Sequence, residues 1–184
     1  MEVKGTAVRS TPLFVRKQFG QRFDEWTGSL SDKSAEIMKS KVVTDLWYPL
    51  QEAFVEPTKK ICGLFFDGDK RGAWEVGRFS ADYALWGLYR LFVRIGSPGH
   101  LIKRASTIFS TYYRPSEMSA TETQSKKAVV QITLFPEPEE LVELRIGGWM
   151  ERALEISGCS GVQMKITKSL TRGDNLTEFV AGWR

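Results

Sequence analysis

The sequence contains few cysteines, a single histidine and no disulfide framework. Of its 184 residues only Cys62 and Cys159 are cysteine, and only His100 is histidine. Two cysteines so far apart make neither a Cys-x-x-Cys pair nor a set of paired bridges, which is typical of proteins in a reducing compartment. We therefore expect a cytoplasmic protein.

Long hydrophobic runs are also missing. The most apolar segment, Ala84–Ile95, is interrupted by Arg90 and Arg94 and ends at Gly96. A membrane-spanning helix needs ~20 apolar residues. Residues 1–20 carry several basic side chains but no continuous apolar core, unlike a secretory signal. The sequence predicts neither a membrane span nor a signal peptide.

Signatures of catalysis and of nucleic-acid binding are absent as well. There is no P-loop, no dinucleotide-binding fingerprint and no Ser-His-Asp arrangement, and Cys62 lies in the apolar stretch "KKICGLFF", where a buried structural thiol is expected. The net charge is +4, but the basic residues are scattered along the chain and are not gathered into a recognition motif. We expect a protein that is not an enzyme and does not bind nucleic acid.

Two features of the sequence suggest metal binding but lack the ligands that a metal ion requires. The segment Asp67–Arg78 is similar to a calcium-binding loop, but the position that requires a bidentate glutamate is occupied by Arg78. His100 falls near the start of a predicted helix, where the helix dipole favours a neutral ring that could bind metal or haem. No second ligand stands three or four residues away, so a solvent-facing or capping histidine is expected, and no metal site is predicted.

Hydrophobic periodicity predicts helices in the first two thirds of the chain and hairpins afterwards. The expected elements are a short strand within residues 1–8, a helix starting at Thr11-Pro12, a short helix over 31–41, a helical region over 47–66 that Pro57 interrupts, a long helix over 74–95, a helix starting at Ser97-Pro98, a hairpin of 118–123 with 128–135, a helix over 136–157 and a second hairpin near the C-terminus. The order favours one domain, residues 1–184, with an α+β fold of helices packed on an antiparallel sheet.

A stripe of small residues runs along the predicted long helix. Its members lie at helical spacing and are Gly77, Ser80, Ala81, Ala84 and Gly87. Small side chains allow a neighbouring backbone to approach closely, and they also leave room for a small apolar guest or for a dimer seam. Periodicity alone leaves these alternatives open.

Several stretches together resemble a superfamily of small-ligand-binding domains. They are "GRFSADYALWGLYRLFVRIGSP", "IFSTYYRP", "GGWMERALEISG" and "SLTRGDNLTEFVAGW". The superfamily includes the haem–nitric-oxide-binding sensors, the four-vinyl-reductase-type domains, aromatic-sensing input domains and the vesicle-tethering TRAPP subunits, and the chain in particular resembles a set of paralogous myxobacterial proteins of about this length. The resemblance implies helices on an antiparallel sheet, a dimer and an internal pocket.

The chain departs from the metal-binding members of that superfamily at defined positions. Where four-vinyl-reductase-type domains have cysteines that help to hold zinc, this sequence has Ser169 and Thr177. The haem sensors hold the propionates with a Tyr-x-Ser-x-Arg motif, and that spacing does not occur here. We therefore expect no cofactor, and in particular we do not expect haem.

Together these observations predict a sensor or small-molecule-binding domain without catalytic activity, acting in bacterial signalling. No output module is recognisable, so it would act through contacts with a protein partner, as a homodimer. The expected ligand is small and apolar or aromatic, and the residues predicted to line its pocket are Tyr83, Trp86, Tyr89, Phe109, Tyr112 and Trp149. The alternative is a ligand-free scaffold resembling the tethering subunits, with a filled interior.

Overall fold

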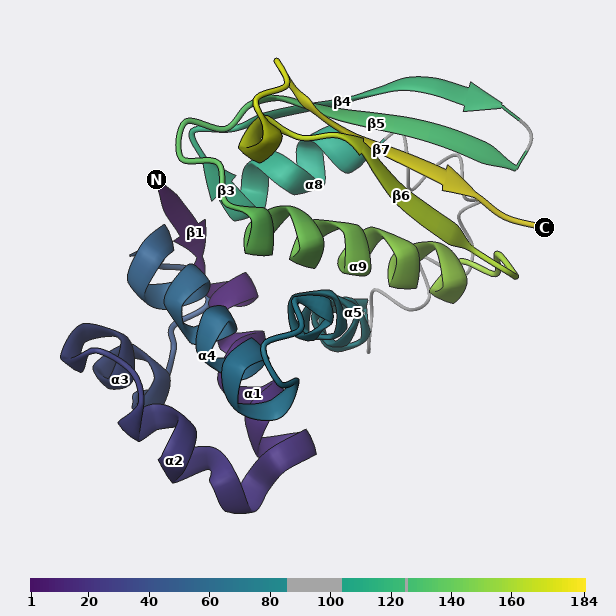
Figure 1. Cartoon of the computed structure of the whole chain (residues 1–184). Coiled ribbons are helices and arrows are strands. Elements are labelled where there is room, and N and C mark those ends of the chain that lie inside the picture. Colours follow the sequence, from purple (N-terminus) through teal and green to yellow (C-terminus); the bar gives the residue numbers. More distant parts are fainter. Residues whose placement is uncertain (86–103, 125) are drawn as a thin grey trace.

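The computed structural model describes residues 1–85, 104–124 and 126–184, and it contains two antiparallel sheets, of which the larger lies at one edge of the molecule with helices on one side (Figure 1). The larger sheet has the strand order β4-β5-β7-β6, and the smaller has the order β2-β1-β3. The strands are β1 (Glu2–Lys4), β2 (Trp47–Pro49), β3 (Tyr113–Arg114), β4 (Glu117–Gln124), β5 (Lys127–Leu134), β6 (Gln163–Lys168) and β7 (Thr177–Gly182).

The helices are arranged in two groups relative to the larger sheet. They are α1 (Gly5–Phe19), α2 (Phe23–Gly28), α3 (Asp32–Lys39), α4 (Glu56–Phe65), α5 (Arg71–Leu85), α8 (Ala105–Tyr112) and α9 (Glu140–Ile156). Short 3₁₀ turns η1 (Gly20–Arg22) and η3 (Leu170–Arg172) and a π-helical turn η2 (Gln51–Val55) complete the secondary structure of the described residues. Figure 1 shows α8 and α9 beside the four-stranded sheet, with α1–α4 gathered away from it. The arrangement confirms the predicted α+β class.

The two predicted hairpins are confirmed. Strand β4 pairs with β5, and β7 pairs with both β5 and β6, all antiparallel. Along β7, Thr177, Phe179 and Ala181 are buried and the residues between them are not. This alternation is a local property of a strand with one face on the core, which is why the sequence pattern sufficed to find it.

The start of the first helix was predicted wrongly. We expected it at Thr11-Pro12, but α1 begins at Gly5, directly after β1, and Pro12 lies inside it. A Cβ atom on Gly5 would lie 2.0 Å from the carbonyl oxygen of Val43, and the Gly5 N–H donates to the carbonyl of Leu46. This contact with a distant loop fixes the start of the helix, and it carries no local sequence signal.

Other predicted boundaries changed for related reasons. Trp47–Pro49, expected to be helical, pairs with β1 as a strand, and Pro57 lies in the first turn of α4, where its missing N–H has no partner to lose. Helix α9 begins at Glu140, four residues after the expected Pro136. The first half of the predicted helix over 74–95 is α5; its second half and the expected start at Ser97-Pro98 lie outside the described residues. No helix within the described residues is long and apolar enough to cross a membrane.

Helices α5 and α9 pack with their backbones in close contact. A Cβ atom on Gly77 would lie 2.1 Å from the carbonyl oxygen of Arg145, and one on Gly148 would lie 2.2 Å from that of Trp74. The first distance confirms close backbone packing as one use of the small-residue stripe. Glycine is required at both positions because any side chain would collide with the opposite backbone.

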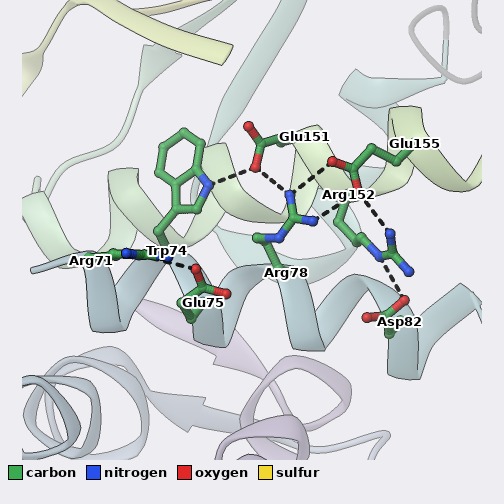
Figure 2. Close-up of polar contacts among 8 residues, drawn as sticks. All are labelled: Arg71, Trp74, Glu75, Arg78, Asp82, Glu151, Arg152 and Glu155. Carbon is green, nitrogen blue, oxygen red and sulfur yellow. Dashed lines mark hydrogen bonds and ion pairs between the residues drawn. The ribbon is translucent and has the colours of Figure 1, made fainter. Parts of the chain in front are cut away.

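A chain of charged side chains crosses the same helix pair (Figure 2). Arg78 on α5 pairs with Glu151 and Glu155 on α9, and Arg152 on α9 pairs with Asp82 on α5. Burial alone would raise the pKa of the Glu155 carboxyl, but hydrogen bonds from Arg78 and Arg152 outweigh it and hold that pKa below its ordinary value. These pairs fix the relative position of α5 and α9, which form one wall of the cavity described next.

Candidate functional site

A cavity of about 100 Å³ lies between α5, α8, α9 and the four-stranded sheet, with α1 closing one side. An engineered cavity of roughly 150 Å³ holds benzene, so this smaller volume admits a single ring only if the walls move apart slightly. The lining residues are Thr6, Ala7, Phe54, Gly77, Ser80, Ala84, Ile108, Phe109, Tyr112, Tyr113, Met118, Ala128, Val130, Arg145, Ile146, Trp149, Met150, Ala153, Leu154, Met164, Phe179 and Ala181.

The walls are almost entirely apolar. Each element contributes side chains at its own spacing: Gly77, Ser80 and Ala84 come from one side of α5, and alternate residues of β5 and β7 come from the sheet. Of the small residues of α5, Gly77 permits close packing, while Ser80 and Ala84 border the cavity, so room for a guest beside them stays a prediction. Gly87 lies outside the described residues.

Three of the six residues predicted to form the pocket lie in its wall. Phe109 and Tyr112 of α8 and Trp149 of α9 line the cavity. Tyr83 does not: its side chain is 37% exposed, because it lies about a quarter-turn around α5 from the side formed by Gly77, Ser80 and Ala84. Trp86 and Tyr89 lie outside the described residues, as does His100. That a ligand contacts these side chains stays a prediction.

The most unusual residue of the cavity wall is Arg145 of α9, which the sequence analysis did not single out. It is only 2% exposed. Its Nη1 donates to the hydroxyls of Thr11 and Thr58 at 3.1 and 2.9 Å, and its Nη2 reaches the hydroxyl of Ser10 at 3.5 Å. Its Nε is buried with no hydrogen-bond partner. No carboxylate in the described part of the chain forms an ion pair with it.

Arg145 nevertheless remains charged at neutral pH. Burial lowers the pKa of its guanidinium to about 9, although Tyr113 and Cys62 act in the opposite direction. This pKa is still well above 7. The guanidinium stacks on the Phe54 ring, with Cζ 3.5 Å from the ring centroid. Such stacking stabilises a cation but satisfies none of its N–H donors. The cavity therefore has an apolar wall with one positive charge in it.

A second buried charge lies on the opposite side of α9. Glu143 is 6% exposed, and its carboxylate accepts hydrogen bonds from the hydroxyls of Ser169, Thr171 and Thr177. It also lies in the first turn of α9, where the helix dipole favours negative charge. Ser169 and Thr177, the two hydroxyls that the sequence analysis compared with zinc-binding thiols, converge on this carboxylate. In residues 1–85, 104–124 and 126–184, no three histidine, cysteine or acidic side chains form a metal-binding group.

Comparison with solved structures places this fold among H-NOX proteins. An H-NOX protein from S. oneidensis in the Fe(II) state superposes with a TM-score of 0.74 at 11% identity, over 98% of this chain and 96% of that one. An H-NOX protein from K. algicida in the unliganded Fe(II) state superposes with a TM-score of 0.70 at 8% identity, over 98% of this chain and 96% of that one. The NMR structure of the SO2144 H-NOX domain from Shewanella oneidensis in the Fe(II)CO state superposes with a TM-score of 0.73 at 12% identity, over 98% of each chain. No protein-family model matches the sequence, and no curated protein is similar to it.

The resemblance to the haem–nitric-oxide-binding superfamily is thereby supported at the level of the fold, and the expectation that haem is absent was wrong. That expectation rested on a missing Tyr-x-Ser-x-Arg motif, yet structures solved with Fe(II) share the fold over nearly the whole chain. The cavity also offers a cation outside any such motif, since Arg145 of α9 is one of its lining residues.

The cavity wall contains side chains whose chemistry fits haem. Tyrosine and methionine are among the axial ligands of haem iron, and Tyr112, Tyr113, Met118, Met150 and Met164 line the cavity. Arg145 supplies a cation for a carboxylate. At about 100 Å³ the cavity is smaller than the roughly 300–1,000 Å³ of pockets for drug-sized ligands, so haem would require the surrounding elements to move apart.

Proposed function

We propose that this protein is a ligand-binding sensor domain that holds a small apolar molecule in the cavity between α5, α8, α9 and the sheet. The observation that carries the proposal is the cavity itself: a space of about 100 Å³ with apolar walls inside the described part of the protein. Binding sites for small molecules are concave and mostly apolar, with few polar groups, and the lining of this cavity has that character.

The remaining parts of the proposal concern how such a domain would act. Residues 1–184 would form one ligand-binding unit without catalytic activity, present in the cytoplasm of a bacterium and related to the myxobacterial paralogues. Ligand binding would be transmitted through contacts with a protein partner or within a homodimer. Supporting this, the cavity is bordered by α1, α5 and α9 as well as by the sheet, so a ligand that separates these elements changes the surface they present.

Haem is a second candidate occupant, favoured by the shared fold with H-NOX proteins solved in Fe(II), Fe(II)NO and Fe(II)CO states. A bound haem would supply an iron that binds diatomic gases. Of the described residues, Tyr112, Tyr113 and the three methionines of the wall are the candidate iron ligands, and Arg145 is the candidate partner of a propionate.

Native mass spectrometry of the purified full chain, with an absorbance scan of the same sample, tests the proposal. We expect a retained small molecule in the wild type, and a Soret band if that molecule is haem. Ala84 borders the cavity, so Ala84→Phe should fill it and abolish retention. The adjacent Tyr83 is exposed, so Tyr83→Ala should leave retention unchanged. Equal retention by Ala84→Phe, or a wild type that binds no small molecule even when one is added, would instead support a ligand-free scaffold.

A further inference from the structure

We propose that Arg145 binds the carboxylate of an apolar acid whose hydrocarbon part occupies the cavity. This inference rests on the proposed function and specifies the chemical class of the ligand. It identifies Arg145 of α9 as the residue that distinguishes an acid from a neutral molecule of the same shape.

The first argument is the incomplete hydrogen bonding of the Arg145 guanidinium. An arginine has five N–H donors and no acceptor. In this structure the Nη1 atom has two good hydroxyl acceptors, the contact of Nη2 with Ser10 is long at 3.5 Å, and Nε has no acceptor. The Ser10 hydroxyl is also shared, since it contacts Ser80 and the carbonyl of Ala7. Donors are therefore left over in a side chain that is 98% buried, given its 2% exposure.

The second argument is a comparison within the same helix. Glu143 shows how this fold satisfies a buried charge when no ligand is needed: three hydroxyls donate to it and the helix dipole supports it. Arg145, two residues later, is far from the helix C-terminus that would favour a cation, and its partners are neutral. A buried charge is stable when a counter-charge or a full set of hydrogen bonds compensates it. A carboxylate in the cavity would supply both.

The third argument is the match between the cation and the rest of the cavity. A carboxylate accepts paired hydrogen bonds from a guanidinium, which fixes its orientation. The other walls are apolar, and the volume suits an acid with a short chain, or one with a single ring if the walls move apart slightly. The carboxylate could belong to a free acid or to a propionate of haem, and the two sources share this recognition chemistry.

The test compares phenylacetate with phenylacetamide, which has nearly the same shape without the charge. We expect the wild-type chain to bind phenylacetate at least roughly tenfold more tightly, as measured by isothermal titration calorimetry. Arg145→Met should remove the preference for the acid, so that phenylacetate loses at least roughly tenfold in affinity and binds no more tightly than phenylacetamide. The matched control is Arg16→Met, because Arg16 also stacks on a phenylalanine, with Cζ 3.5 Å from the Phe23 ring, but is exposed and away from the cavity.

Each outcome separates this inference from the proposed function. If acid and amide bind equally well, or if Arg145→Met binds the acid as tightly as the wild type, the inference is wrong while the cavity remains a binding site. If neither compound binds, haemin is the remaining source: an Arg145-dependent Soret band supports the inference, and its absence overturns both proposals. Folding is monitored by thermal melting, where a buried arginine replaced by methionine should be neutral or stabilising.

Discussion

Two charged residues on α9 show how differently one helix can accommodate buried charge. Glu143 accepts hydrogen bonds from hydroxyl donors, whereas Arg145, one of the residues that line the apolar cavity, has a buried Nε without an acceptor. Both are inconspicuous in the sequence. Arg145 lies three residues after Val142 and four before Trp149, and an arginine between apolar residues at helical spacing is the signal that could have identified it.

The sequence did not show which side chain Ser169 and Thr177 contact. The comparison of these hydroxyls with zinc-binding thiols stays a prediction. Their common partner, Glu143, is 26 residues before Ser169 and 34 before Thr177, and nothing local connects them. Long-range polar contacts of this kind depend on the packed fold and are not encoded in periodicity.

Replacing Glu143 by glutamine should destabilise the protein by about 1–3 kcal/mol, because the amide offers an NH₂ group to hydroxyls that now donate to a carboxylate. The measurement is urea unfolding monitored by circular dichroism. Glu140→Gln is the matched control: it lies in the same first turn of α9 but is 50% exposed, so its cost should stay below about 1 kcal/mol. Equal effects of the two substitutions would show that the hydroxyl contacts contribute nothing.

At the scale of elements, local patterns predicted strands better than helix boundaries. The hairpins follow from alternation that each strand carries by itself. The start of α1 and the strand at Trp47–Pro49 depend on partners far along the chain, namely Val43 and β1. The small-residue stripe predicted a close approach at Gly77, but the second glycine of that contact, Gly148, became evident only from the packed helices.

Gly148→Ala should weaken the α5–α9 contact, since its Cβ would overlap the Trp74 carbonyl and one of the two helices would have to move. We expect a loss of at least about 1–3 kcal/mol in the free energy of unfolding, the usual cost of overpacking. Gly63→Ala is the control: Gly63 is an exposed residue of α4, and no neighbouring element comes within 4 Å of the place that a Cβ would occupy, so alanine should be neutral or stabilise by up to about 1 kcal/mol. A Gly148→Ala variant as stable as the wild type would contradict the packing described here.

At the scale of the whole molecule, the sequence predicted the architecture better than the ligand. Diffuse apolar spacing over most of the chain was enough to indicate helices on an antiparallel sheet, and the H-NOX structures share that fold over 98% of the chain. The cofactor was misjudged because a motif was treated as the only way to bind a propionate. A cavity is assembled from side chains of many separate segments, and its volume and charge are properties of the fold rather than of any motif.

The central claim, that the cavity receives a small apolar molecule, is tested most directly by methyl NMR of the methionines. Three of the five methionines, Met118, Met150 and Met164, line the cavity, whereas Met38 is buried elsewhere in the core. When toluene is added to protein labelled at its methionine methyl groups, we predict saturable shifts of these three signals and no shift of Met38. Signals that all remain unchanged, or that shift together with Met38, would contradict the account.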